Sequence, residues 1–289
     1  MSEITVQRVD GESLIVRFTN PPEGFLTPAM LPRLEEALEA AEADPQVRVI
    51  VLTGGVHGVF IQHYWDPDAN LSGGDTPETA ATNAPQPPLP SGLRKVCDRI
   101  ERSAKPVIAA INGTCLGGGL EVALACDMRI AQMGHYSIGP TEIHLGVLPG
   151  NGGLRRLTRL IGAAPAFELV ALGMTLSPDG AASRGLVNFV TPNALDASLA
   201  LAKRLAARPS KALAHLKQLV NGATEAAADG NADEEKLCQE LWNSAEAIAR
   251  MRAFNRGEFD VRDGYPVNAH KSDAHTGVPE RSTPRLRIV

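Results

Sequence analysis

The stretch KPVIAAINGTCLGGGLEVALACD, which runs from Lys105 to Asp127, decides the fold of this chain. It begins with a short apolar run, Val107 to Ile111, that is long enough for a buried strand and too short for a helix. Asn112 and Gly113 then turn the chain, and three consecutive glycines follow from Gly117 to Gly119. Glycines adopt backbone angles closed to other residues and leave their amide groups uncovered. The stretch therefore predicts a strand, a glycine-rich turn and a helix in direct succession.

Glu121 is the one charged residue of the predicted helix from Leu120 to Cys126, which is otherwise apolar on all sides and is expected to be buried. An ionised carboxylate is costly to bury without a partner. Two interpretations are open: Glu121 caps the start of its own helix, or it is a site carboxylate. The glycine amides beside it favour a site, because amides at a helix start bind negative charge, including the charge that develops on a carbonyl oxygen during a reaction.

The composition is that of an ordinary globular chain with one sizeable core and an appendage: 289 residues, of which 44% are hydrophobic and 21% charged. A net charge of -5 does not indicate binding to nucleic acid. No apolar run approaches the ~18 residues of a membrane span, and the N-terminus lacks the pattern of a secretory signal. We therefore expect no membrane partner and a cytoplasmic location. Four cysteines without CxxC spacing predict reduced core residues and no metal site.

Segments on both sides of this stretch alternate between strand and helix patterns. Asp10-Gly11 joins two β-rich runs and predicts a hairpin. Val47 to Leu52 predicts a strand covered on both faces, and Leu186 to Val190 predicts the final strand. Pro67 to Pro90 is rich in proline, glycine and small polar residues and predicts a long loop. Helical spacing of apolar residues predicts helices over residues 28–41, 92–104, 154–161, 164–172, 195–207, 211–228 and 233–254.

The stretch from Lys105 to Asp127 resembles the signature of the enoyl-CoA hydratase/isomerase (crotonase) superfamily. The similarity continues through IGPTEIHLGVLPGNGGLRRLTRLIG, from Ile138 to Gly162, and through MTLSPDGAASRGLVNFV beyond it. Several motifs in family order make the resemblance specific, whereas a lone triple glycine would not. It implies an α/β, crotonase-like (ClpP/crotonase) fold, in which repeated ββα units form a spiral and a C-terminal helical region follows.

The resemblance also implies how the chain is divided. We expect the spiral core over residues 1–192 and a helical trimerisation region over residues 193–256. An extended tail over residues 257–289 departs from shorter family members. Helices of such a region pack on neighbouring subunits in this family, so a homotrimer or a dimer of trimers is the expected assembly.

In this family two backbone amides bind the thioester oxygen of the substrate, one from a Phe-x-Ala-Gly-x-Asp pattern and one from the triple glycine. FIQHYWD, from Phe60 to Asp66, stands at the first place, so Gln62 and Gly118 are the expected oxyanion-hole residues. His63 stands where the family has glycine, and is either a catalytic base or a structural, hydrogen-bonded histidine. PPEGFL, from Pro21 to Leu26, departs from the family's usual CoA contact, so no CoA-binding residue is assigned.

Pro140-Thr141-Glu142 matches the Pro-Glu site of the family with one inserted residue, at a separation from Glu121 of 142 − 121 = 21 residues. The alternative is that Glu142 is a carboxylate of a surface loop. The helix that follows carries Arg155, Arg156 and Arg159, which either meet the CoA phosphates or form salt bridges between subunits. The glycines before this helix do not indicate a dinucleotide site, because no clean parallel strand precedes them.

The function that the resemblance implies is hydration of a trans-2-enoyl-CoA to a 3-hydroxyacyl-CoA. Glu121 and Glu142 would hold the water between them, and no metal or redox cofactor is expected, since CoA is part of the substrate. Two alternatives are open: another reaction of the superfamily, such as isomerisation, thioester hydrolysis or C–C bond chemistry, and a catalytically idle CoA-binding or assembly protein. The paired glutamates favour hydration, because a single carboxylate can shift a double bond.

Overall fold

The computed structural model describes residues 2–64, 91–145 and 148–222. The chain divides into two compact units, Met1–Asp233 and Glu234–Val289, and every described element lies in the first. The predicted loop over residues 67–90, the helix over residues 233–254 and the tail over residues 257–289 lie outside the described residues. In chain order the elements are β1 (Glu3–Val9), β2 (Ser13–Thr19), η1 (Pro28–Met30), α1 (Leu31–Ala43), β3 (Val49–Gly54), β4 (Val59–Ile61), α2 (Ser91–Arg102), β5 (Val107–Ile111), β6 (Thr114–Leu116), α3 (Gly118–Ala125), β7 (Met128–Gln132), β8 (Ile138–Gly139), η3 (Glu142–Leu145), α4 (Gly153–Ile161), α5 (Ala163–Ala171), α6 (Pro178–Ser183), β9 (Phe189–Thr191), α7 (Ala194–Ala206) and α8 (Ser210–Gly222).

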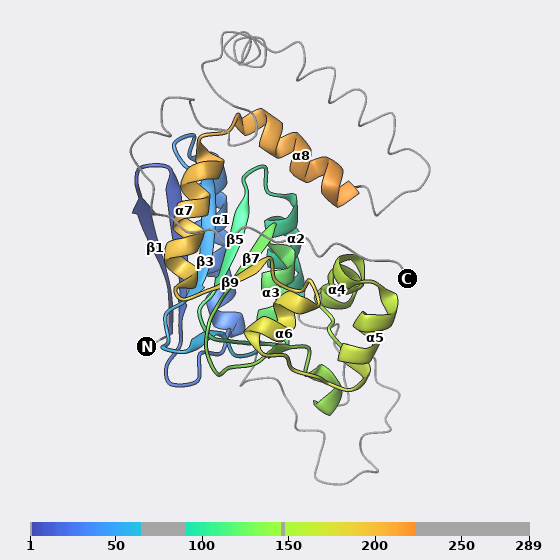
Figure 1. The fold of residues 1–289 in the computed structure, drawn as a ribbon. Coiled ribbons are helices and arrows are strands. Elements are labelled where there is room, and N and C mark those ends of the chain that lie inside the picture. Colours follow the sequence, from blue (N-terminus) through green and yellow to red (C-terminus); the bar gives the residue numbers. More distant parts are fainter. Residues whose placement is uncertain (1, 65–90, 146–147, 223–289) are drawn as a thin grey trace, which may run out of the picture. The chain divides into compact units, whose positions relative to one another are not determined.

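A six-stranded sheet in the order β1-β2-β3-β5-β7-β9 forms the centre of this unit (Figure 1). The hairpin of β1 and β2 is antiparallel, and every later pair is parallel. Asp10 and Gly11 have φ angles of 51° and 74°, which a tight turn between twisted strands requires. The hairpin predicted from this dipeptide is therefore confirmed.

A second, three-stranded parallel sheet contains the short strands β4, β6 and β8. The chain leaves each long strand, adds a short strand to the second sheet and then forms a helix, as in β3-β4-α2 and β5-β6-α3. Glycine is needed where the chain changes sheets, since a Cβ at Gly54 would lie 1.8 Å from the carbonyl oxygen of Val59. Asn112 bonds through its side chain to both the N–H and the C=O of Gly54 at 3.0 Å. The predicted ββα units are confirmed.

Helices cover both faces of the large sheet (Figure 1). Alternate strand residues point to opposite faces, so one set packs against α7 and the other against α1, α2 and α3. Val49 to Gly54 is buried along its whole length, which confirms the strand predicted to be covered on both faces. The first set comprises Val49, Val51, Ile108, Ala110 and Ile130, and the second includes Ile50, Leu52, Val107, Ala109 and Ile111.

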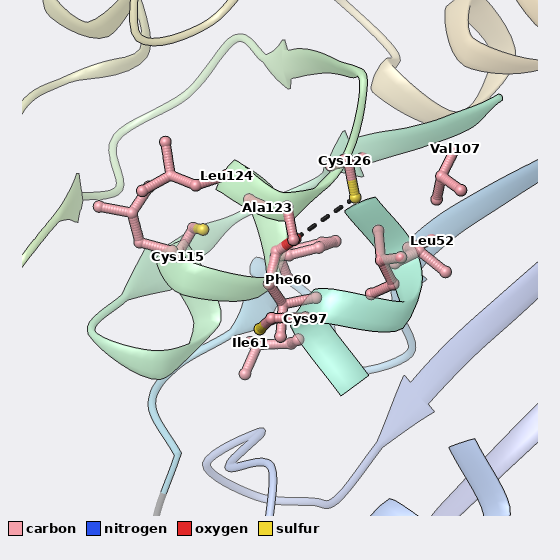
Figure 2. Close-up of a cluster of buried hydrophobic side chains, with 14 of the residues drawn as sticks. Leu52, Phe60, Ile61, Cys97, Val107, Cys115, Ala123, Leu124 and Cys126 are labelled. Carbon is pink, nitrogen blue, oxygen red and sulfur yellow. Dashed lines mark hydrogen bonds between the residues drawn. The ribbon is translucent and has the colours of Figure 1, made fainter. Parts of the chain in front are cut away.

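Three cysteines belong to the core on the second face (Figure 2). Cys97, Cys115 and Cys126 are buried and unpaired, and burial raises the pKa of each thiol, that of Cys126 to about 12. The thiol of Cys126 donates to the carbonyl oxygen of Val122 at 3.4 Å. The prediction that these cysteines are reduced core residues is confirmed for these three, and Cys238 lies outside the described residues.

Several predicted boundaries differ from the observed ones by a few residues, and for the last strand the structure gives a physical reason. The last strand begins at Phe189 and not at Leu186, because the carbonyl of Leu186 accepts a hydrogen bond from the Arg129 side chain at 3.0 Å instead of joining the sheet. Helix α7 packs against the large sheet through Ala194, Ala202 and Ala206, and the predicted division of the chain at residues 192 and 256 stays a prediction. Among the described helices, none is long and apolar enough to cross a membrane.

Candidate active site

The start of α3 is built from glycines that pack closely against the segment after β4. Gly117 precedes the helix with φ 49° and ψ −121°, and a Cβ there would lie 2.2 Å from Nε2 of His63, so only glycine fits. No side chain of the described residues caps α3. A Cβ at Gly118 would lie 2.3 Å from the Cβ of Tyr64. Uncapped amides at a helix start suit negative charge, which supports the role predicted for Gly118.

The backbone of Gln62 does not match its predicted role. Its N–H donates to the carbonyl oxygen of Gly24 at 3.0 Å, and the N–H of Leu26 donates to the carbonyl oxygen of His63 at 2.9 Å. These bonds pair the segment after β4 with the PPEGFL segment. The Gln62 amide is therefore already engaged, and the expectation that it is available to a thioester oxygen is corrected. Sequence could not reveal this, because the partner lies 38 residues earlier (62 − 24 = 38).

His63 is held in one orientation. Its Nδ1 lies 2.9 Å from the carbonyl oxygen of Tyr64, and a carbonyl only accepts, so Nδ1 carries the proton and Nε2 is the acceptor in the neutral ring. Nε2 is buried and has no hydrogen-bond partner in the described structure. The contact supports the interpretation of a hydrogen-bonded histidine, and a role as a base stays a prediction.

Glu121 is buried, with 3% of its surface exposed, and accepts three hydrogen bonds. The backbone N–H groups of Asn151 and Gly153 donate to its Oε1 at 2.7 and 3.0 Å, and the side-chain amide of Asn151 donates to Oε2 at 2.7 Å. Glu121 therefore caps the start of helix α4. The capping interpretation supposed instead that Glu121 caps the start of its own helix, α3. The positive end of the α4 dipole adds a favourable field for a carboxylate.

Glu142 has the opposite surroundings. It begins η3, is 6% exposed, and neither carboxyl oxygen has a hydrogen-bond partner among the described residues. Burial raises its pKa to about 7, and the negative charge of Glu121 adds to the rise. The amides of Glu142 and Thr141 partly offset it, although neither is placed to make a hydrogen bond with the carboxyl group. The interpretation of Glu142 as a surface carboxylate is therefore wrong.

The two glutamates line one small cavity. Its volume is about 10 Å³, and its wall also includes Gly117, Leu120 and Pro140. A cavity of about this size is needed to hold one water molecule. Larger cavities of about 450 and 510 Å³ lie elsewhere and include neither glutamate. The fold thus brings together the carboxyl groups that the sequence separates by 21 residues.

The arginines of α4 bind acidic residues of α2 in the same chain. The Arg156 side chain, 1% exposed, donates to Glu101 at 2.8 Å and to Asp98 at 2.7 Å, and Arg155 and Arg159 also pair with Glu101. Burial alone would raise the pKa of Glu101, but Arg156 and Arg155 lower it to about 2. These ion pairs lie within the chain, and contact of the arginines with CoA phosphates or with a neighbouring subunit stays a prediction. The spacing of Asp98 and Glu101 on one predicted helix was the available signal.

The fold is that of the crotonase class of enzymes, and the two glutamates are the candidate catalytic residues of its site. A family model described as "Enoyl-CoA hydratase/isomerase" matches residues 11–256, and the chain belongs to this family, whose members act on acyl-CoA thioesters. The predicted family, crotonase-like fold and enzyme class are therefore confirmed.

Relatives and solved structures agree with this assignment. The chain is 32% identical over 252 residues to "Probable enoyl-CoA hydratase" of Bacillus subtilis, covering 85% of this chain and 93% of that one. It is 36% identical over 204 residues to "Fatty acid oxidation complex subunit alpha" of Shewanella putrefaciens, where the match covers 69% of this chain and spans only 27% of the relative. A crystal structure of enoyl-CoA hydratase from Bacillus anthracis superposes with a TM-score of 0.75 at 29% identity, covering 88% of this chain and 96% of that chain.

Proposed function

We propose that this enzyme adds water across the 2,3 double bond of a trans-2-enoyl-CoA and forms a 3-hydroxyacyl-CoA. The observation that carries the proposal is that Glu121 and Glu142 line one cavity of about 10 Å³, which suits one water molecule. Hydration needs one group that takes a proton from water and another that supplies a proton to C2. Two buried carboxyl groups in contrasting surroundings meet that requirement.

Each glutamate has surroundings that suit one proton transfer. Glu121 presents two acceptor oxygens held by three N–H donors, so it takes the proton of the water as the oxygen attacks C3. Glu142, with a pKa of about 7, keeps a proton in a large share of molecules at neutral pH and gives it to C2. The two roles exchange in the reverse reaction.

The start of α3 supplies the third element of the proposed site. The amide of Gly118 would bind the thioester oxygen and stabilise the negative charge that develops there, an effect of about 3 kcal/mol for one donor. The reaction as proposed moves only water and protons, so it calls for no metal or redox cofactor. A homotrimer or dimer of trimers, the absence of nucleic-acid and membrane partners, and a cytoplasmic location remain predictions.

The test is the loss of the conjugated thioester absorbance of crotonyl-CoA with the purified protein. We expect hydration, and we expect kcat/KM to fall by about tenfold for each pH unit above roughly 7, because Glu142 then loses its proton. A protein that shifts 3-enoyl substrates without hydrating crotonyl-CoA would be an isomerase. One that binds CoA esters without turnover would be an idle member of the family.

A further inference from the structure

We infer that Asn151 positions Glu121 for proton transfer by tying its carboxylate to a buried ionic cluster formed by Asp98, Glu101 and Arg156. The inference rests on the proposed function, because it concerns the group that takes the proton from water. It goes beyond the hydrogen bonds to Glu121 that the proposed mechanism uses, because it assigns a positioning role to Asn151 and to Arg156 of α4.

Asn151 forms hydrogen bonds to both Glu121 and Arg156. Its backbone N–H donates to Oε1 of Glu121 and its side-chain amide to Oε2, each at 2.7 Å, while its carbonyl oxygen accepts from Nη1 of Arg156 at 2.9 Å. The last torsion of a glutamate side chain is normally broad. With a donor on each oxygen, the carboxyl plane cannot turn without breaking a hydrogen bond. Asn151 thus fixes the direction in which Glu121 presents its lone pairs.

The ionic cluster fixes Asn151 in turn. The guanidinium of Arg156 donates through Nε and Nη2 to Glu101 at 3.1 and 2.8 Å and through Nη2 to Asp98 at 2.7 Å. These contacts leave Nη1 for the Asn151 carbonyl, and the planar group is rigid. Replacing a buried ion pair by apolar residues often costs no stability. A task in locating the loop therefore explains this cluster better than a contribution to stability alone.

The neighbouring glycines leave room for these contacts. A Cβ at Gly152, where φ is 88°, would lie 2.5 Å from Nη1 of Arg156, and a Cβ at Gly153 would lie 2.6 Å from Cγ of Glu121. Asn151 is consequently the one residue of the run from Gly150 to Gly153 that carries a side chain beyond Cα. That side chain is an uncharged donor, which holds a carboxylate without neutralising it.

The first test compares Asn151→Ala and Asn151→Asp with the wild type in crotonyl-CoA hydration. Alanine keeps the backbone donor and loses the side-chain donor, so we expect kcat to fall about tenfold with little change in KM, as expected for one lost hydrogen bond to a charged group. Aspartate has the same shape but sets a second carboxylate against Glu121, so a larger loss is expected.

The matched control is Asn193→Ala. It removes an asparagine hydrogen bond at the start of α7, the 3.1 Å bond from the N–H of Asp196, outside the contacts of Glu121. We expect it to lower thermal stability while kcat and KM stay at wild-type values. If Asn151→Ala also leaves kcat unchanged, or if Asn193→Ala lowers kcat equally, the inference is overturned.

A second measurement needs no turnover and separates failure of this inference from failure of the proposed function. Urea unfolding of the wild type, Asn151→Ala, Glu121→Gln and the double variant forms a double-mutant cycle. We expect the asparagine change to cost clearly less stability once Glu121 is glutamine. Additive effects would overturn the inference even in an enzyme that hydrates crotonyl-CoA. If the two changes are not additive but the protein hydrates no enoyl-CoA, the interaction of Asn151 with Glu121 is upheld and only the proposed reaction is rejected.

Discussion

Glu121 and Glu142 are the same residue type in the same cavity, 3% and 6% exposed, yet their surroundings differ in almost every respect. Glu121 accepts three hydrogen bonds from the loop before α4, and Glu142 accepts none from the described residues. Donors favour the ionised form of a carboxyl group, whereas burial without donors favours the protonated form. The difference teaches that the packing around each glutamate, and not the side chain itself, sets its surroundings, and under the proposed mechanism these surroundings decide which glutamate takes a proton and which gives one.

Removing the acceptor from this pair should have the largest effect. In Glu121→Gln the amide cannot take a proton from water, so we expect hydration of crotonyl-CoA to slow by about 1000-fold. Converting Glu142 as well should cost little more than the worse single change, because groups that act together are not additive. CoA binding and thermal unfolding serve as controls. If Glu121→Gln is folded and keeps more than about a tenth of the wild-type rate, Glu121 is not the group that takes the proton from water.

Glu142, which has no hydrogen-bond donor among the described residues, is expected to make the free energy of unfolding depend on pH. The pKa of Glu142 rises from 4.5 to about 7 on folding, so below about pH 4.5 both states are protonated and the shift costs nothing. As pH rises, the unfolded state ionises first, and above about pH 7 the cost reaches about 3 kcal/mol. Glu142→Gln should therefore gain about 3 kcal/mol in urea unfolding at pH 8 relative to its effect at pH 4. An equal effect at both pH values would refute the raised pKa.

Adding one methyl group at Gly153 tests whether the position of Glu121 among its hydrogen-bond donors matters for the reaction. In Gly153→Ala the new Cβ would lie 2.6 Å from Cγ of Glu121, so the carboxylate must move away from its donors. We expect kcat to fall about tenfold, because small displacements of a reacting group are costly. Gly222→Ala is the matched control, since a Cβ there meets no atom of the described residues within 4 Å, and it should keep the wild-type rate.

The smallest effect is expected at Gln62. Its backbone amide is bound to Gly24, and neither this residue nor its side chain lines the cavity that holds the two glutamates. Gln62→Ala should change the hydration rate by less than about twofold, within the ordinary range of a substitution away from such features. A much larger loss in steady-state kinetics would show that the glutamine side chain contacts the substrate.

Much of the architecture could be predicted from local patterns. The apolar run Val107 to Ile111 is β5 with the predicted bounds, because a short buried strand needs only apolar residues and a turn after it. Asn112 and Gly113 make that turn, and Asp10-Gly11 makes the hairpin. This strand and these turns depend on residues close in sequence, so they can be predicted without knowledge of the fold. The strand at Phe189 was displaced because a distant arginine, Arg129, took the carbonyl of Leu186.

The sequence by itself determined which residues could form a site: a triple glycine, a carboxylate in an apolar helix and a second glutamate after Pro140. Only the tertiary structure decided what surrounds them. Glu121 meets donors 30 residues away, at Asn151. The Gln62 amide is bound to Gly24, and the arginines of α4 are bound to α2. Hydrogen bonds and ion pairs act over a few ångströms in space, whatever the separation along the chain, so their partners become known only when the sheets and helices have packed.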